Sequence, residues 1–197
     1  MRLLLATSNH GKIRELKGIL GSLHCQLLSL NDIDPIEGVE ETGLTFIDNA
    51  LIKARHYFLA TGIPSIADDS GLSVDALGGA PGVRSARYAG TEATDSERVV
   101  KILEEMVGVP DALRRARFIC AAAIVSEAGQ KTFTGEVEGV ILREPRGANG
   151  FGYDPIFFYE PYGRAIAELS KEGKSIISHR GIAFRKLALW LESSLLS

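Results

Sequence analysis

Cysteine and long apolar runs are both scarce in this chain, and their scarcity argues against several classes of protein. The 197 residues include two cysteines, Cys25 and Cys120, which lie far apart and form no CxxC pair. We therefore expect neither a disulfide framework nor a zinc site. No apolar stretch approaches the roughly 20 residues that a membrane-spanning helix needs, so we do not expect a membrane protein.

Net charge is also low. The chain has 22 Lys and Arg residues against 25 Asp and Glu residues, which gives a net charge of −3. A protein whose main task is to hold nucleic-acid polymer needs a broad basic surface, so we do not expect that class. A small anionic ligand could still be held by a local cluster of cations. Internal repeats and low-complexity segments are lacking as well, which argues against solenoid and disordered architectures.

The length favours one domain over residues 1–197, because domains commonly have roughly 100 to 200 residues and no linker divides this chain. The start, MRLLLATSNHGK, has a short apolar run followed at once by polar residues, and it lacks a small-residue cleavage site. We interpret it as a first strand rather than a signal peptide. A cytoplasmic protein is the simplest expectation.

Residues 64–90 contain the densest group of polar and glycine residues, PSIADDSGLSVDALGGAPGVRSARYAG. We expect a short apolar strand that ends in Asp68-Asp69-Ser70-Gly71, which would place these side chains at the carboxyl edge of a sheet, where open α/β folds bind ligands. The following GGAPG predicts tight turns. A polar loop that merely caps a strand is the alternative interpretation.

A second polar segment, residues 7–12 with the sequence TSNHGK, joins the first strand to an amphipathic helix over residues 12–20. Free backbone N–H groups at such a helix start favour an anion, although the segment lacks the Walker pattern GxxxxGK[ST]. Ser8 or Asn9 could instead simply cap the helix. Capping does not explain Lys12, because a cation at the positive end of the helix dipole is unfavourable without a bound anion.

Capping patterns and hydrophobic periodicity predict the remaining elements. The expected helices cover residues 45–62, residues 94–107 and a closing segment from Ile182, and the expected strands cover residues 25–30, 118–125, 131–143 and 156–158. The strands 118–125 and 131–143 are predicted to form a hairpin. Lys53 flanks the apolar stripe of helix 45–62, where a lysine stem commonly lies along the core edge. Glu40 and Glu41 precede that helix and could be solvated charges.

The aromatic turn Gly150-Phe151-Gly152-Tyr153-Asp154 is a candidate site for a flat ligand. Its glycines let the backbone come close while the Phe151 ring stacks, although a tight turn with a core Phe is an equal alternative.

A second cation stands at a helix start. His179 and Arg180 are predicted in the first turn of the closing helix, where positive charge is again unfavourable without a partner. Lys12 and Arg180 both place positive charge at a helix start, against the preference of the helix dipole. Two such exceptions indicate a functional reason.

The unusual residues combine into one kind of chemistry. Hydrolysis of a nucleoside triphosphate needs oxygen ligands for Mg²⁺, cations for the phosphate chain, a carboxylate that activates water and a surface for the base. The chain offers each of these. The carboxylates are Glu40, Glu41, Asp68 and Asp69, the cations are Lys12, Lys53, Lys174 and Arg180, and the aromatic surface is Phe151.

Five blocks in this sequence resemble the inosine triphosphate pyrophosphatase family, whose members act on the non-standard purine nucleotides ITP, dITP and XTP. The blocks are TSNHGK, EETGLTFIDNALIKA, ADDSGLSVDALGGAPGVRSARYAG, GFGYDPIF and KSIISHRG, and they span nearly the whole chain in order. The resemblance implies a mixed α/β fold with a long twisted central sheet, flanking helices and two lobes around an active-site cleft. It also implies a homodimer and a Mg²⁺-dependent reaction of NTP with water that releases NMP and pyrophosphate.

The resemblance also implies residue roles. Asp69 would be the general base and a metal-linked carboxylate. Glu41, or its neighbour Glu40, would be the other metal-side acid, and Asp68 would support them. The positions that match phosphate contacts are Thr7, Ser8, Asn9, His10, Gly11, Lys12, Lys53 and Ser70. The positions that match nucleoside contacts are Phe151, Gly152, Tyr153, Asp154, Lys174, His179 and Arg180.

Base specificity is then a question of hydrogen bonding. Our hypothesis is that Arg180 or His179 donates to the 6-keto oxygen of hypoxanthine or xanthine, a group that adenine replaces with a donor. Three alternatives remain. A serine hydrolase with Ser70 and His179 would need a GxSxG elbow, which the sequence lacks. A nucleotide-binding regulator would not need the acidic pair Asp68-Asp69, and a pyrophosphatase for modified pyrimidines would use the same phosphate chemistry.

Overall fold

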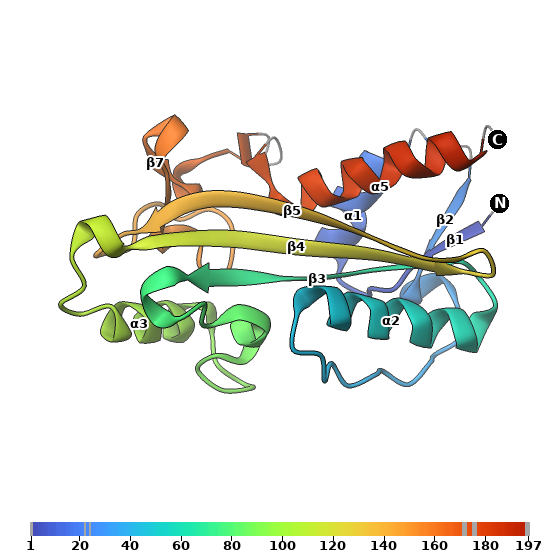
Figure 1. Ribbon diagram of the computed structural model, residues 1–197, viewed down its shortest axis with the longest axis horizontal. Coiled ribbons are helices and arrows are strands. Elements are labelled where there is room, and N and C mark those ends of the chain that lie inside the picture. Colours follow the sequence, from blue (N-terminus) through green and yellow to red (C-terminus); the bar gives the residue numbers. More distant parts are fainter. Residues whose placement is uncertain (1, 22, 24, 171–172, 175–176, 196–197) are drawn as a thin grey trace. The chain divides into compact units, whose positions relative to one another are not determined.

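The computed structural model describes residues 2–21, 23, 25–170, 173–174 and 177–195 (Figure 1). The chain forms two compact units. Unit 1 comprises Met1–Asp69, Cys120–Gly135 and His179–Ser197, and unit 2 comprises Ser70–Ile119 and Glu136–Ser178. Among the described residues, none of the helices has the length and apolar character needed to cross a membrane.

The seven strands form one mixed sheet in the order β2-β1-β3-β4-β5-β6-β7. Their bounds are β1 Arg2–Leu5, β2 Gln26–Ser29, β3 Ser65–Val74, β4 Arg115–Ser126, β5 Gly129–Ile141, β6 Phe157–Tyr159 and β7 Arg164–Ala165. β1 pairs in parallel with β2 and β3, whereas β5–β6 and β6–β7 are antiparallel. The longer helices are α1 His10–Leu20, α2 Phe46–Thr61, α3 Asp95–Glu105 and α5 His179–Leu195. The predicted mixed α/β class, with a central sheet and flanking helices, is confirmed.

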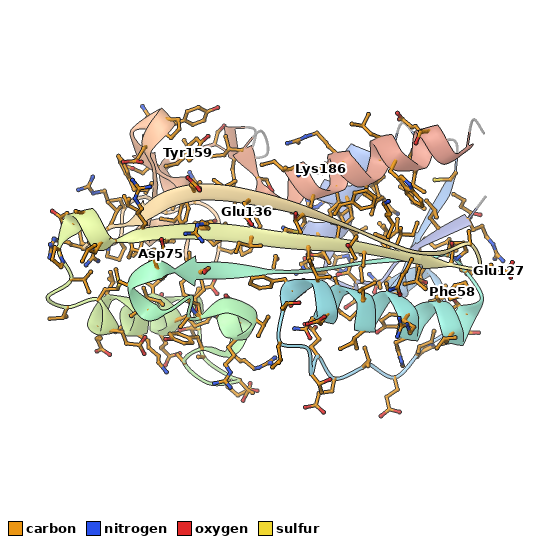
Figure 2. The ribbon with its side chains drawn as sticks, in the orientation of Figure 1. Phe58, Asp75, Glu127, Glu136, Tyr159 and Lys186 are labelled. Atoms are coloured by element: carbon orange, nitrogen blue, oxygen red, sulfur yellow. The ribbon has the colours of Figure 1, made fainter. Side chains whose placement is uncertain are left out.

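Unit 1 has helices on both faces of its strands, because side chains of a strand point alternately to opposite faces. Cys120 and Ala122 of β4 share a core with residues of α1 and α5. The intervening Ala121 and Ala123 share a second core with α2, against which Phe58 also packs (Figure 2). A run of small residues in β4 therefore lets helices approach the sheet from both sides.

α2 and α3 begin where capping residues in the sequence predict a helix start. Thr45 caps α2: its hydroxyl accepts from Asp48 N at 3.1 Å, and Asp48 Oδ2 accepts from Thr45 N at 3.1 Å. Gly62 ends the helix with φ of 66°, a left-handed conformation that glycine adopts without strain. α3 begins with the same reciprocal pair, Thr94 and Glu97. The closing helix α5 starts at His179, so His179 and Arg180 lie in its first turn as predicted, ahead of the apolar segment from Ile182.

One prediction for the central stretch was wrong. β3 does not end at Asp68-Asp69-Ser70-Gly71 but continues to Val74. Leu72 and Val74 are fully buried, so the polar residues interrupt the strand without ending it. Gly71 permits this continuation, because a Cβ atom there would lie only 2.2 Å from Ser85 Oγ. That hydroxyl accepts a hydrogen bond from Leu72 N at 2.9 Å.

Asp68 lies near the carboxyl end of β1 rather than at the carboxyl end of its own strand, β3. Leu5, the last residue of β1, is paired with Ile66 of β3. Asp68 therefore lies beyond the carboxyl end of its neighbour strand, next to the segment that leaves β1 for α1. The expectation that ligand-binding residues gather at a carboxyl strand end thus applies to β1 rather than to β3.

Candidate functional site

Two cations and a carboxylate meet in the interior of unit 1. Lys12 Nζ of α1 donates to Asp68 Oδ2 at 2.9 Å and to Oδ1 at 3.2 Å. Arg180 Nε of α5 donates to the same Oδ2 at 3.2 Å, and Arg180 Nη1 donates to Glu15 Oε2 at 3.0 Å. Asp68 is 5% exposed and Arg180 4%. This buried cluster draws β3, α1 and α5 together.

Charge balance keeps the cluster ionised. Burial of the Asp68 carboxyl raises its pKa, but the nearby charges of Lys12, Arg180 and Lys53 outweigh burial and hold the pKa well below its usual range. Burial of the Arg180 guanidinium lowers its pKa, yet Asp68 and Glu15 more than compensate and raise it. The two cations that stand at helix starts thus have a shared anion, the side chain of Asp68.

The segment between β1 and α1 is capped from within. Asn9 Oδ1 accepts from Gly11 N at 2.9 Å and from Lys12 N at 3.1 Å. Thr7 Oγ1 accepts from Asn9 N at 3.2 Å, and the Ser8 carbonyl accepts from Asn31 Nδ2, just after β2, at 3.4 Å. The capping interpretation is therefore confirmed for Asn9. Exposed Ser8, Asn9 and His10 surround these N–H groups, so an anion there would have to displace the Asn9 side chain.

Asp69 lies in a different environment from its neighbour Asp68. Asn49 Nδ2 of α2 donates to Asp69 Oδ2 at 3.0 Å, and Asn49 Oδ1 accepts from Gly43 N at 2.7 Å. Asn49 is fully buried. Its amide therefore holds Asp69 and the loop before α2 at the same time.

Sequence reasoning missed Asn49 and Glu15 as parts of this site. A signal existed for Asn49, because asparagine is a poor residue for a helix interior and this one lies one turn before Lys53. For Glu15 no local signal existed, since an exposed-looking glutamate in an amphipathic helix is ordinary. Its contact with Arg180 joins residues 165 positions apart.

Glu41, one of the two predicted metal-side acids, lies close to a lysine. Glu41 Oε1 and Lys53 Nζ are 3.1 Å apart, with side chains 31% and 16% exposed, while Glu40 is exposed. Within the described part of the chain, no group of three or more His, Cys, Asp or Glu side chains could hold a metal ion. Mg²⁺ needs only one or two carboxylates, because water and substrate phosphates complete its shell. Asp69 and Glu41 offer carboxylate oxygens of the kind that Mg²⁺ prefers. Glu41 is paired with Lys53, and Asp68 is engaged with Lys12 and Arg180.

The aromatic turn belongs to unit 2. Gly150 and Gly152 have φ of 84° and 62°, so a left-handed backbone flanks Phe151, whose side chain is 61% exposed. Lys174 Nζ lies 4.2 Å from the centroid of the Phe151 ring and pairs with Asp154. The alternative of a core Phe is therefore wrong: the turn is tight, and its ring is at the surface.

Two buried polar side chains support this turn. Asp154 is 3% exposed, and its Oδ2 accepts from Phe151 N at 2.9 Å. Burial raises the pKa of Asp154, and the charge of Lys174 partly offsets that rise. Tyr153 is 4% exposed and donates from its hydroxyl to the Ser85 carbonyl at 2.8 Å.

The predicted site residues therefore form two groups, one in each unit. Unit 1 brings together Lys12, Glu41, Lys53, Asp68 and Arg180 through ion pairs and electrostatic contacts, and it also contains Asp69, which contacts Asn49. Unit 2 brings together Phe151, Asp154 and Lys174, with Gly152 and Tyr153 in the same turn. Ser70 is a half-buried residue of β3, and His179 is the half-buried first residue of α5.

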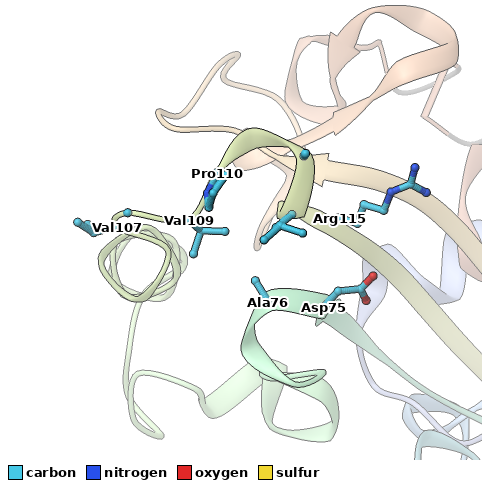
Figure 3. A pocket seen from close by; sticks show the side chains of 9 residues that line it. Asp75, Ala76, Val107, Val109, Pro110 and Arg115 are labelled. Atoms are coloured by element: carbon cyan, nitrogen blue, oxygen red, sulfur yellow. The ribbon is translucent and has the colours of Figure 1, made fainter.

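A surface cavity of about 640 Å³ in unit 2 lies elsewhere (Figure 3). It is lined by Asp75, Ala76, Val107, Gly108, Val109, Pro110, Ala112, Leu113 and Arg115. No predicted site residue is among them. The lining is mainly apolar, and its charged members are Arg115 and Asp75, of which Asp75 pairs with Arg117.

Comparison with known sequences decides the family. The sequence profile of the Ham1 family matches residues 3–190. The chain belongs to the Ham1 family. Similar family members include proteins named dITP/XTP pyrophosphatase from Shigella flexneri, 51% identical over 94% of this chain and 95% of that protein, and from Escherichia coli strain K12, 50% identical over the same shares.

Solved structures of Ham1 proteins agree with this fold. A HAM1 protein from Coxiella burnetii superposes with a TM-score of 0.93 at 43% identity, covering 98% of this chain and 99% of that one. A nucleoside-triphosphatase, dITP/XTP pyrophosphatase, from Mycobacterium abscessus superposes with a TM-score of 0.82 at 45% identity, covering 97% and 99%. The resemblance to pyrophosphatases seen in the five sequence blocks thus extends to the whole chain.

Proposed function

We propose that this protein is a Mg²⁺-dependent nucleoside triphosphate pyrophosphatase that converts ITP, dITP and XTP into the monophosphate and pyrophosphate. The observation that carries the proposal is the arrangement in unit 1, where Asp69 is held by a buried amide next to a carboxylate that balances two cations. The 51% identity to a relative named dITP/XTP pyrophosphatase supports the same activity. Removal of such nucleotides from the cellular pool is the corresponding role.

Asp69 is the proposed general base. It takes a proton from a water molecule as the water oxygen attacks the α-phosphorus of the substrate. The bond from that phosphorus to the bridging oxygen breaks, and pyrophosphate leaves with the electron pair. The Asn49 amide donates to one Asp69 oxygen and so orients the carboxylate. A positioned carboxylate base of this kind contributes roughly 10²- to 10⁴-fold to the rate.

The residues that would hold Mg²⁺ are Asp69 and Glu41. When bound, Mg²⁺ neutralises charge on the phosphate chain and on the departing pyrophosphate. Lys12 and Lys53 supply positive charge for the same oxygens. Ser70 and the Thr7–Lys12 segment are the proposed hydrogen-bond donors to phosphate. The place of Thr7–Lys12 beyond the carboxyl end of β1 supports its role.

Nucleoside binding is assigned to the aromatic turn and to the start of α5. The exposed ring of Phe151 would stack on the base, with Gly152, Tyr153, Asp154 and Lys174 shaping its surroundings.

For the 6-keto oxygen, Arg180 and His179 are the two candidate donors that would distinguish hypoxanthine and xanthine from adenine. Arg180 donates from Nε and Nη1 to carboxylates, which supports an additional role in holding Asp68. A homodimer and a cytoplasmic location complete the proposal.

The deciding experiment compares ITP, XTP, GTP, ATP and dTTP with and without Mg²⁺, with product identification by chromatography. We expect metal-dependent formation of IMP or XMP with pyrophosphate, far faster than turnover of GTP or ATP. IDP with orthophosphate would contradict attack at the α-phosphorus. Preference for dTTP would leave the phosphate chemistry in place but overturn the base assignment, in favour of modified pyrimidines.

Replacement of the base tests the mechanism. Asp69→Asn should lower kcat at least about 100-fold while KM for ITP stays similar, because the amide cannot accept the proton. Asp75→Asn is the matched control, since Asp75 is a partly exposed carboxylate that pairs with Arg117. Substantial residual kcat in Asp69→Asn would exclude Asp69 as the base.

A further inference from the structure

Asp95, which the sequence did not single out, contacts the aromatic turn of unit 2. It is the first residue of α3. Its Oδ2 accepts a hydrogen bond from Gly152 N at 2.6 Å, across 57 positions of the chain. Gly152 directly follows Phe151, the residue whose ring is exposed. A carboxylate from outside the turn therefore holds the peptide that sets the direction of that ring.

The start of α3 does not need this carboxylate for its own cap. Thr94 Oγ1 accepts from Glu97 N at 3.2 Å, and Glu97 Oε2 accepts from Thr94 N at 2.7 Å. These two residues satisfy the helix start reciprocally. Asp95 is thus not needed for the cap, and its Oδ2 atom is directed at the turn.

Arg98 fixes Asp95 in place. Its guanidinium pairs with Asp95 Oδ1, while Nη1 donates to the Ala86 carbonyl at 3.0 Å and to the Ala93 carbonyl. One Asp95 oxygen is thereby anchored to the loop before α3, and the other is directed at Gly152. Such a two-sided contact orients the carboxylate more firmly than a single exposed ion pair would.

The other contacts of the turn involve Phe151 and Tyr153, whereas the Gly152 N–H group is bound by Asp95. Asp154 accepts from Phe151 N at 2.9 Å, and Tyr153 donates to the Ser85 carbonyl at 2.8 Å. Gly152 itself has φ of 62°, a conformation with few local restraints. The hydrogen bond from Gly152 N to Asp95 Oδ2 holds this peptide.

We propose that Asp95 is a positioning residue for nucleoside binding, which holds the Gly152 peptide so that the Phe151 ring stands ready to stack on the purine. This proposal rests on the base-stacking role of Phe151 in the proposed function. Asp95 touches neither the phosphates nor the reacting atoms. Its loss therefore weakens binding of substrate and transition state alike, which raises KM and leaves kcat nearly unchanged.

The test measures kcat and KM for ITP in three variants. Asp95→Ala should raise KM about tenfold, the usual effect of losing a hydrogen bond to a charged group. Asp95→Asn keeps an acceptor oxygen and should stay within about threefold of the native KM. Glu97→Ala is the matched control, because it removes the capping partner of the same helix without contact to the turn. It should lower the melting temperature and leave KM unchanged.

A double-mutant cycle tests whether Asp95 acts through the ring. On a Phe151→Ala background, Asp95→Ala should add less than about twofold to KM, since coupled residues are not additive. If Asp95→Ala fails to fold, Asp95→Ser takes its place, because serine is compatible with a helix start and is too short to reach the turn.

The outcomes separate this proposal from the proposed function. If Phe151→Ala raises KM but Asp95→Ala behaves like Glu97→Ala, the positioning role is overturned and base stacking stands. If Phe151→Ala leaves KM for ITP unchanged while Mg²⁺-dependent turnover persists, both the stacking assignment and the role of Asp95 are overturned. A fall in kcat at unchanged KM in Asp95→Ala would also contradict the proposal.

Discussion

Asp68 and Asp69 are neighbours in sequence with different partners. Successive residues of a strand point to opposite faces. Asp68 therefore meets Lys12 of α1 and Arg180 of α5, whereas Asp69 meets Asn49 of α2. Two cations bind the first carboxylate, and a buried amide donates to the second. The contacts of Asp68 favour a structural role, and the role of Asp69 as general base stays a proposal.

Removal of the Asp68 charge should destabilise the protein strongly. Asp68→Asn would leave the 4%-exposed Arg180 with less compensating charge. We expect a loss of about 3–5 kcal/mol in the free energy of unfolding, the usual effect of breaking a buried ion pair. Urea denaturation measures it. Asp75→Asn, which breaks the exposed pair with Arg117, should cost less than about 1 kcal/mol. Equal losses in the two variants would contradict the assignment.

The same cluster predicts a pH dependence. The folded state lowers the pKa of Asp68, so its contribution is complete above the unfolded pKa of about 3.9 and is lost as the pH falls through the lower folded value. The stability difference between native protein and Asp68→Asn should therefore be constant from about pH 5 to 7 and shrink below about pH 4. Urea denaturation in EDTA at several pH values checks this. A difference that grows on acidification would refute it.

Among the secondary-structure elements, β5 and α5 approach each other unusually closely in unit 1. A Cβ atom on Gly135 of β5 would lie 2.2 Å from the His179 carbonyl oxygen and 2.6 Å from Ala183 N. Lys186 of α5 also donates to the Thr134 carbonyl at 2.7 Å (Figure 2). The absence of a side chain at Gly135 thus lets the start of α5, with Arg180, lie against the strand.

Gly135→Ala should therefore disturb both stability and activity. Backbone atoms meet the new methyl group, so the start of α5 must shift, at a cost of about 1–3 kcal/mol. Displacement of Arg180 from Asp68 should lower kcat/KM for ITP as well. Gly18→Ala in α1 is the control: nothing lies within 4 Å of its Cβ position, and alanine should stabilise the helix by about 0.5–1 kcal/mol. Thermal melting and ITP turnover compare the variants. A neutral Gly135→Ala would contradict the close approach.

At the scale of the whole molecule, three strands belong to both units. The boundaries between the units fall at Asp69/Ser70 within β3, Ile119/Cys120 within β4 and Gly135/Glu136 within β5. Each of these strands is a continuous stretch of chain with residues in both units. The prediction of one domain over residues 1–197 is therefore best tested through cooperativity.

We expect one cooperative unfolding transition. Trp190, the single tryptophan, reports on unit 1. A second probe, Tyr162→Trp in a Trp190→Phe background, would report on unit 2, where Tyr162 is 45% exposed. Both fluorescence curves in urea should coincide with far-UV circular dichroism, as two-state unfolding requires. Separate midpoints would show two independently folding domains instead.

Local signals in the sequence were sufficient for most elements. The reciprocal caps at Thr45 and Thr94 and the stop at Gly62 lie where the structure has them, because capping depends on residues three or four positions apart. The end of β3 was not predictable in this way. Polar residues usually end a strand, and only the contact between Gly71 and Ser85 shows why this one continues to Val74.

The sequence by itself determined the class of fold, the helix starts and the kinds of side chain that the site offers. It also showed two cations, Lys12 and Arg180, at unfavourable positions. Only the tertiary structure decided that both meet Asp68, across 56 and 112 positions, and that Asp95 reaches Gly152 across 57. The physical reason is the distance along the sequence over which each effect acts. Caps and hydrophobic periodicity depend on residues a few positions apart, whereas the packing of helices on a sheet determines which charges from distant parts of the chain meet.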